Sequence, residues 1–371
     1  MEDRNLYLLA LSLTRGLGPV TVKNLIAYCG SAQAVFTTPK GKLLRVPGIG
    51  EQTVRLVRES ASLQRAEQEM AFCERQGVMV LNYLDPAYPD ALKYIHDAPL
   101  ILFKKGAIDL NAQPNIALVG TRQATDYGKE QTELFAAFLA SRGINVVSGL
   151  AYGIDIVAHR TVLQAGGMTT AVLGHGLDMI YPARHARKAD EMLARGGLLT
   201  EYLTGTQPDA VNFPARNRIV AGICRAVIVI EAAASGGALI TARKAFEQNR
   251  EVYALPGRVG DLYSSGCNQL IRDNVAKLIT NPEDVLEDLR IQWQHHDDQS
   301  QQLELTLAAP PVPLSTEEAT ILNYLAQQGE ALIDQITLAT GIPMSRLNAL
   351  LIGMEFKELL RQMPGKRYKK W

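Results

Sequence analysis

Short apolar runs alternate with amphipathic stretches through the middle of the chain. The runs are rich in β-branched residues, and most end at or beside glycine or an acidic residue: 115–120, 143–149, 169–174, 198–202, 226–231 and 251–257. Helical patterns separate several of them, at 129–141, 156–164 and 239–249. Nearly continuous apolar strands separated by helices predict a parallel sheet covered on both faces. We therefore expect a doubly wound α/β domain over 71–290, with ligands at the carboxyl ends of its strands.

Both flanks of this region follow a helical pattern instead. Residues 1–70 predict a small domain of short helices, in which V-P-G-I-G at 46–50 resembles the turn of a helix-hairpin-helix element. Such a turn brings backbone N–H groups close to a phosphate, although a tight helical turn without a ligand would have the same pattern. At the other end, a capping box at 315–318 and three helices followed by a hairpin predict a winged helix over 314–371. The Gln- and Pro-rich residues 291–313 predict a linker.

The charge of the chain is unevenly distributed, although its 371 residues carry 38 basic and 38 acidic side chains and sum to zero. Residues 1–65 hold nine Lys or Arg against four Asp or Glu, and the final eleven residues hold five bases and no acid. A net charge is a sum, whereas binding depends on where the charges lie. Nucleic acid therefore remains a candidate partner.

No segment predicts secretion or membrane insertion. Acidic residues precede the short N-terminal apolar run, and no apolar stretch reaches 18 residues. The wide spacing of the cysteines favours reduced thiols in a cytoplasmic protein over disulfides or a zinc site. Since the histidines are scattered too, we expect no metal and no other cofactor. The four cysteines are Cys29, Cys73, Cys224 and Cys267.

The ends of the predicted strands carry residues suited to bind an anion. Arg122 follows the first strand in V-G-T-R, shortly before a helix, and suits a single phosphate. The G-x-G-x-x-G pattern of dinucleotide-binding folds is absent there. Ser148 and Gly149 end the second strand, where glycine allows close backbone approach. The Ser-Gly-Gly loop at 235–237 leads into a helix and would present backbone N–H groups to a ligand.

The most distinctive segment is N-F-P-A-R-N-R-I-V, which contains Phe213, Arg216, Asn217 and Arg218. Because arginine pairs with phosphate and stacks on bases, this segment suits a polyanion. Either arginine could instead form a salt bridge with Asp155 or Glu231 and hold loops together. Asp155 could also cap a helix, and His159 could simply pack in the core. Without a nucleophile elbow, a Walker loop or a pair of carboxylates, the sequence predicts a binding pocket rather than an active site.

Seven motifs, in this order, resemble the DNA-processing protein A family, also called DprA or Smf. They are V-G-T-R at 119–122, S-G-L-A-Y-G-I-D-I-V-A-H at 148–159, A-V-L-G-H-G-L-D-M-I-Y-P at 171–182, F-P-A-R-N-R-I-V-A-G at 213–222, S-G-G-A-L-I-T-A at 235–242, L-P-G at 255–257 and G-C-N-Q-L-I at 266–271. The resemblance covers essentially the whole chain. It implies an extended Rossmann-like domain between a helical domain, similar to a sterile-alpha-motif or helix-hairpin-helix module, and a winged helix.

The resemblance also implies a function. Members are non-enzymatic proteins of natural transformation that bind and protect single-stranded DNA, recruit RecA and help load it past single-strand-binding protein. Their central domain forms a homodimer. The DNA contacts that it implies here are Arg122, Ser148, Gly149, Arg184, Phe213, Arg216, Asn217, Arg218, Ser235, Gly236 and Gly237.

Two details of the resemblance concern individual positions. Many members place a basic residue directly after the Tyr-Pro pair, where this chain has Ala183 followed by Arg184. Arg184 would then replace that residue, or the contact is missing. The stretch around Leu270 and Ile271 is the candidate for contacts with the second subunit and with RecA.

Two other functions remain open. The Ser-Gly-Gly turn resembles that of nucleoside-monophosphate phosphoribohydrolases of the lysine-decarboxylase-like group. Those enzymes carry P-G-G-x-G-T-x-x-E there, whereas the nearest downstream acid in this chain is Glu247. A double-strand-binding regulator acting through the winged helix is the second alternative. Its third helix, 345–360, carries two bases against two acids and would be a poor reader of the major groove.

Overall fold

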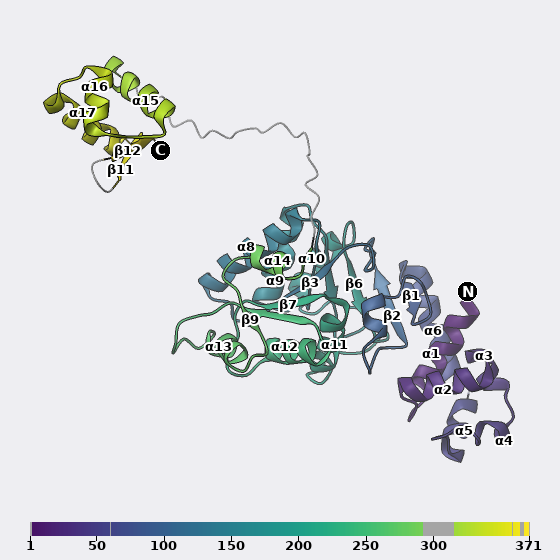
Figure 1. Cartoon of the computed structure of the whole chain (residues 1–371). Coiled ribbons are helices and arrows are strands. Elements are labelled where there is room, and N and C mark those ends of the chain that lie inside the picture. The colour runs from purple at the N-terminus through teal and green to yellow at the C-terminus, as the bar shows by residue number, and fades with distance from the viewer. Residues whose placement is uncertain (1, 60, 292–314, 358, 364–366, 371) are drawn as a thin grey trace. The chain divides into compact units, whose positions relative to one another are not determined.

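The computed structural model describes residues 2–59, 61–291, 315–357, 359–363 and 367–370. The chain divides into two compact units, Met1–Trp293 and Gln294–Trp371 (Figure 1). Nearly all of the predicted linker, 291–313, lies outside the described residues. Within the described ranges, no single helix is long and apolar enough to span a membrane.

A nine-stranded sheet forms the centre of the first unit, in the order β1-β2-β6-β5-β4-β3-β7-β8-β9. Neighbouring strands from β6 to β9 are parallel, whereas β2 pairs antiparallel with both β1 and β6. The predicted doubly wound parallel sheet is therefore confirmed. Three strands that the sequence did not indicate, β1, β2 and β9, extend it at its two ends. The bounds are β1 (Met79–Asn82), β2 (Ile101–Lys105), β3 (Asn115–Val119), β4 (Asn145–Ser148), β5 (Thr169–Val172), β6 (Gly197–Thr200), β7 (Ala226–Val229), β8 (Glu251–Ala254) and β9 (Lys277–Leu278).

Helices cover both faces of the sheet, which is why every residue of β3, β4 and β7 is buried and apolar runs mark the strands. In Figure 1, α8, α9 and α14 lie on one side of the strands and α11, α12 and α13 on the other. Phe135 of α8 and Ile219 of α11 are fully buried in the two apolar cores. The helices of this region are α7 (Asp90–Lys93), α8 (Asp126–Ser141), α9 (Ile154–Gln164), the short 3-10 helix η1 (Ala183–His185), α10 (Ala186–Met192), α11 (Asn212–Ile223), α12 (Gly237–Glu247), α13 (Ser265–Arg272) and α14 (Glu283–Asp288).

The order in which strands are added to the sheet reverses on either side of β3. From β3 the chain proceeds outward through β4, β5 and β6, and then returns to the other side of β3 to form β7, β8 and β9. The loops that leave the carboxyl ends of β3 and its neighbours therefore diverge. Such a switch point leaves a crevice where ligands bind in open α/β sheets.

Six N-terminal helices pack beside β1 and β2 within the same unit. Asn5 Nδ2 donates to the carbonyl of Val80 at 3.1 Å. The buried Glu69 carboxylate accepts from the backbone N–H and hydroxyl of Thr204, and pairs with Arg65 at 2.8 Å. The predicted Gly-Ile-Gly turn lies between α4 and α5, with Gly48 at φ +82°. The helices are α1 (Glu2–Leu13), α2 (Pro19–Cys29), α3 (Ala32–Thr37), α4 (Lys40–Leu43), α5 (Glu51–Arg58) and α6 (Ala61–Gln76).

The second unit is a winged helix, as predicted. Ser315 and Glu318 form the expected capping box of its first helix, and Ile321, Leu325 and Leu351 are fully buried in its core. A three-stranded sheet, in the order β10-β12-β11, forms the wing. The elements are α15 (Thr316–Gln328), β10 (Glu330–Leu332), α16 (Ile333–Thr340), α17 (Met344–Phe356), β11 (Leu360–Met363) and β12 (Arg367–Lys370).

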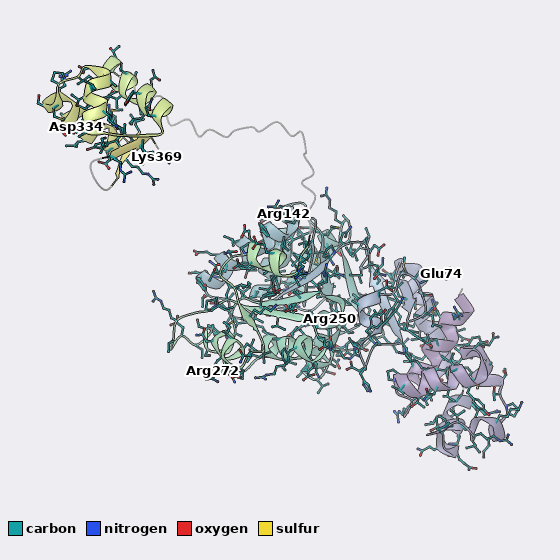
Figure 2. All side chains as sticks on the ribbon, in the orientation of Figure 1. Glu74, Arg142, Arg250, Arg272, Asp334 and Lys369 are labelled. Carbon is teal, nitrogen blue, oxygen red and sulfur yellow. The ribbon has the colours of Figure 1, made fainter. Side chains whose placement is uncertain are left out.

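Arginines in the first unit also serve the fold. Arg250, labelled in Figure 2, donates to the carbonyls of Ala91 at 2.7 Å and Gly222 at 3.1 Å and so joins β8 to α7 and α11. A basic side chain near the sheet is thus no sign of ligand binding unless its donors are free.

Candidate functional site

A cleft of about 930 Å³ opens at the carboxyl ends of β3, β4 and β7, beside the switch point. Its walls come from the loops after these strands, the start of α11 and the start of α12. Eight of the predicted site residues line it: Arg122, Gly149, Phe213, Arg216, Asn217, Ser235, Gly236 and Gly237.

The turn that carries Arg122 is packed tightly against its neighbours. Thr121 donates its N–H to the carbonyl of Glu231 at 2.8 Å and accepts from the N–H of Ile154 at 3.1 Å. Gly153 has a φ of +75°, and a Cβ there would lie 2.1 Å from the Thr121 carbonyl oxygen. The close approach of these two loops therefore requires glycine at this position.

The side chain of Arg122 projects into the cleft with its charge uncompensated. Its guanidinium carbon lies 5.3 Å from the centroid of the Phe213 ring, and this ring lies 6.2 Å from that of Tyr181. Arg122 is exposed and forms no salt bridge with any other residue that the structure describes. A guanidinium beside an aromatic face offers both a phosphate donor and a stacking surface.

A buried carboxylate fixes the far side of this turn. Glu231 accepts from the backbone N–H of Thr125 at 3.0 Å and from its hydroxyl. The same hydroxyl caps α8 by accepting from the N–H of Gly128 at 3.1 Å. The sequence left Glu231 as a candidate partner for the arginines, whereas in the structure it binds Thr125.

Arg216 lines the cleft with two of its nitrogens, Nε and Nη1, engaged in hydrogen bonds. The side chain donates to the carbonyls of Gly149, at 3.1 Å, and Val172, and to the side-chain oxygen of Asn217 at 3.1 Å. The residue is only 5% exposed. Burial lowers the pKa of its guanidinium, and the nearby Asp155 carboxylate opposes this effect. Since arginine keeps its proton in proteins, Arg216 places a permanent positive charge behind the cleft wall.

The sequence left open whether Asp155 caps a helix or pairs with an arginine, and the structure shows its contacts. Its carboxylate accepts from the N–H groups of Gly149 at 3.1 Å and Ala151 at 3.3 Å, so it organises the loop after β4. Burial raises the pKa of Asp155, and Arg216 opposes this rise. His159 is buried as well, with its Nδ1 2.7 Å from Thr169 Oγ1. Both side chains thus have structural contacts.

The first turn of α12 supplies backbone donors to the cleft. The N-cap residue of this helix is Gly236, which has no side chain with which to cap the first-turn N–H groups. The Asn217 side chain donates to the Gly237 carbonyl at 3.2 Å and ties this turn to α11. A helix N-terminus with unpaired N–H groups attracts an anion.

The remaining predicted residues lie elsewhere. Arg218 pairs with Glu201 at 2.5 Å and Asp97 at 3.2 Å, away from the cleft lining. Leu270 is fully buried in the core on one face of the sheet, so it offers no surface for a partner, and Ile271 is partly buried against the same core. Ser148 is buried and donates to the Leu118 carbonyl at 2.6 Å. Arg184 is exposed outside the cleft.

The lining also contains side chains that were not predicted, among them those of Tyr181 and Arg243. Tyr181 belongs to the conspicuous Tyr-Pro pair, but nothing in the sequence indicates that its ring approaches Phe213. Arg243 lies in the second turn of α12 and forms a long ion pair with Asp273, at 3.8 Å. Both could be found only from the packing of distant segments.

The winged helix offers few free cations on its third helix. Arg346 pairs with Glu317 at 2.8 Å, and Lys357 at the end of α17 pairs with Glu318 at 2.7 Å. On the wing, Arg367 pairs with Glu330 at 2.9 Å. These pairs reduce the positive charge available to a DNA groove.

No cluster of three or more His, Cys, Asp or Glu side chains in the described ranges could hold a metal ion. The four cysteines are free thiols, and Cys73, Cys224 and Cys267 are buried. Burial raises the pKa of the Cys73 thiol to about 12, which leaves it protonated at neutral pH. Neither feature adds a reactive group to the cleft.

Comparisons with known proteins agree with this architecture. A family model described as DNA recombination-mediator protein A matches residues 79–290, and one described as DprA winged helix domain matches residues 306–366. Protein Smf of Synechocystis is 34% identical over 392 residues, covering 98% of each chain. The X-ray structure of DNA processing protein A from Streptococcus pneumoniae has a TM-score of 0.64 at 35% identity and covers 80% of this chain and 99% of that one. A structure of the Helicobacter pylori protein, which concerns its single-stranded DNA binding mode, has a TM-score of 0.53 at 30% identity and covers 58% of this chain and 97% of that one.

Proposed function

The chain belongs to the DNA recombination-mediator protein A family, and from this premise we propose that it binds single-stranded DNA in the cleft at the end of β3. In natural transformation it protects incoming strands and helps load RecA onto them. The observation that carries this proposal is the exposed Arg122 guanidinium, which has no acidic partner among the described residues and lies over the Phe213 ring.

Each group in the cleft has a role in this proposal. Arg122 contacts a backbone phosphate, and the N–H groups at the start of α12 provide a second anion contact. Phe213 stacks on a base. Arg216 and Asp155 shape the loop at Gly149 and add positive charge from behind it. All of these contacts are independent of base identity, so the binding is tolerant of sequence and weakens with salt.

Arg218 and Ser148 have no direct contact with DNA in this proposal. The Nε and Nη2 donors of Arg218 serve ion pairs with Asp97 and Glu201, and the hydroxyl of Ser148 serves a backbone carbonyl. Their effect on DNA is indirect, through α11 and the end of β4. We assign the direct contacts to Arg122 and Phe213.

The protein acts by binding, without catalysis. Asp155 is the one acidic residue in the described lining of the cleft, and backbone N–H groups occupy its carboxylate. A phosphoribohydrolase needs an acid free to act on the sugar. Release of free base from AMP at a useful turnover, abolished by Arg122→Ala, would contradict this assignment.

The protein works in the cytoplasm as a homodimer, with RecA as its partner and single-strand-binding protein as the protein it displaces. Because Leu270 is buried, the subunit contact uses neighbouring exposed positions, such as Leu278 on the edge strand β9, which is 53% exposed. A dimer presents two clefts to one strand and raises the effective concentration for the second contact. The solved Helicobacter pylori relative supports the choice of single strands.

The decisive experiment is a competition between single-stranded and duplex DNA of the same length for the full-length protein. We expect single strands to bind more tightly at physiological salt and Arg122→Ala to lose most of this difference. A preference for duplex at that salt would contradict the proposal. Equal single-strand affinity of wild type and Arg122→Ala would remove the cleft as its site.

A further inference from the structure

A second aromatic residue with an arginine over its ring lies beside the cleft but outside its lining. The guanidinium carbon of Arg184 lies 5.0 Å from the centroid of the Tyr152 ring. His185 contacts the same ring edge-on, at 5.2 Å and 72°. We call these three residues the Tyr152 platform. Tyr152 is 39% exposed, and Arg184 is exposed and forms no salt bridge with a described residue.

The Tyr152 platform adjoins the cleft through the loop after β4. Ala151, on one side of Tyr152, lines the cleft. Gly153, on the other side, packs against the turn that carries Arg122. Three residues before Arg184, the cleft residue Tyr181 is 44% exposed. The two chain segments that form the platform, the loop with Tyr152 and the stretch with Arg184 and His185, are therefore each adjacent in sequence to residues that line the cleft.

Buried neighbours, His185 and Leu150, hold the Tyr152 platform in place. His185 is 5% exposed, and its Nδ1 lies 2.8 Å from the carbonyl oxygen of Leu150. Leu150 itself is fully buried at a φ of +58°, a conformation that costs a branched residue free energy unless its surroundings impose it. The loop is thus ordered before any ligand arrives, which lowers the entropic cost of stacking on it.

We propose that the Tyr152 platform is a second nucleotide subsite for the strand that occupies the cleft, an inference that rests on the proposed function. The Tyr152 ring stacks on a base and Arg184 binds the adjoining phosphate, as Phe213 and Arg122 do in the cleft. An aromatic face with an unpaired guanidinium fits single-stranded nucleic acid, because unpaired bases expose the faces that a duplex conceals. The strand leaves the cleft past Tyr181 and crosses Tyr152.

The test is the length dependence of binding. A ladder of oligo(dT) lengths, from the shortest that binds upward, is titrated against full-length wild type, Tyr152→Leu, Tyr152→Phe and Arg184→Gln. Matched controls are Tyr94→Leu, at a tyrosine that is 87% exposed, and Arg187→Gln, at an arginine 90% exposed and paired with Glu191. Thermal unfolding shows whether each variant is folded.

We expect Tyr152→Leu to bind the shortest oligomers like wild type and the longer ones about tenfold more weakly, since stacking on an aromatic side chain contributes about 1–3 kcal/mol per base. Tyr152→Phe should retain wild-type affinity at every length. Arg184→Gln should weaken only the longer oligomers and reduce their salt dependence. The two controls should follow wild type.

The outcomes separate this inference from the function on which it rests. If Arg122→Ala weakens binding at every length but Tyr152→Leu and Arg184→Gln match wild type along the ladder, the second subsite is wrong and the cleft stands. An equal loss at all lengths in Tyr152→Leu would also overturn it. If wild type binds no single strands, both proposals fail. Should Tyr152→Leu not fold, Arg184→Gln decides.

Discussion

The carboxylate of Glu231, at the end of β7, accepts hydrogen bonds from both the backbone N–H and the hydroxyl of Thr125, 106 residues earlier in the chain. Thr125 begins α8 and lies three residues after Arg122. This one side chain therefore joins two central strands at the point where the proposed DNA contact leaves the sheet. Buried carboxylates that accept two donors hold their neighbours firmly.

Glu231→Gln should loosen this turn. One of the two Thr125 donors would face an amide NH₂ group, which cannot accept, and we expect a loss of about 1–3 kcal/mol in the free energy of unfolding. Single-strand affinity should fall while its salt dependence stays that of wild type, because Arg122 is displaced but still present. The measurements are denaturant unfolding and a salt titration, with Glu133→Gln on the exposed face of α8 as the control. Wild-type stability in Glu231→Gln would show that the two bonds contribute little.

Arg122→Ala should weaken binding to oligo(dT) and oligo(dA) alike, by roughly tenfold. The magnitude of the slope of log K against log salt should fall by about 0.7, the value for one phosphate contact on a single strand. Fluorescence anisotropy across a salt series measures both quantities. Arg160→Ala, at an exposed arginine paired with Glu133, is the control. An unchanged slope would show that Arg122 makes no phosphate contact.

Arg216→Ala should damage the fold as well as the binding. The substitution leaves the carbonyls of Gly149 and Val172 without a donor and removes the positive charge near the buried Asp155, so we expect a loss of about 3–5 kcal/mol in unfolding free energy. Arg122→Ala, at an exposed position, should stay within about 0.5 kcal/mol of wild type. Chemical unfolding of the two variants side by side tests this contrast. Equal stability of both would mean that Arg216 is a surface contact after all.

Gly153→Ala should lower the free energy of unfolding by more than the left-handed backbone conformation at this position would cost by itself. Its new Cβ would lie 2.1 Å from the Thr121 carbonyl oxygen, which must move and take the Arg122 turn with it. Gly143 has a similar φ, +68°, but open space around it, so Gly143→Ala measures the cost of the left-handed conformation alone, about 1–2 kcal/mol. We expect Gly153→Ala to exceed this cost and to lose single-strand affinity. If the two variants match in stability and binding, the close approach of the loops is unimportant.

His159 should make the protein sensitive to acid. Thr169 Oγ1 donates to the Val146 carbonyl at 2.8 Å, so it accepts from His159 Nδ1. This leaves Nε2 unprotonated and buried, with no hydrogen-bond partner among the residues that the structure describes. Burial first, and then the neighbouring His185 and Arg216, lower the pKa of His159 to about 3.

Below pH 6.5 the unfolded chain therefore binds a proton at His159 that the folded chain excludes. Stability should fall as the pH drops from about 6.5 toward 3, at up to about 1.4 kcal/mol per pH unit from this residue. Unfolding midpoints measured across that range for wild type and His159→Gln test this, and the variant should show the shallower dependence. A parallel decline in both proteins would assign the acid sensitivity to other groups.

The order of the elements could be predicted from the sequence because it depends on local rules. Apolar runs of five to seven residues, such as 115–120, form strands because helices bury both of their faces. Glycine and arginine after β3 indicated a ligand loop. The edge strand β1 and its neighbour β2 were missed because their pattern is short and β1 is only half buried.

The direction of each arginine was decided by tertiary structure. The segment around Arg216 and Arg218 suggested that both side chains could bind a polyanion, but it forms the helix α11. Residues two apart on a helix point in nearly opposite directions, because each residue turns the chain by about 100°. Arg216 thus lies at the cleft, and Arg218 reaches Glu201 behind it.

What the sequence by itself determined is the doubly wound sheet, the flanking helical segments and the set of loops where a ligand would bind. Only the tertiary structure decided which side chains in those loops are free. A charged group binds a ligand when no partner in the fold satisfies it, and most partners of Arg216, Arg218 and Glu231 come from other loops and strands. Arg122 and Arg184 form no salt bridge within the described residues. They lie over the rings of Phe213 and Tyr152, which come from other segments of the chain.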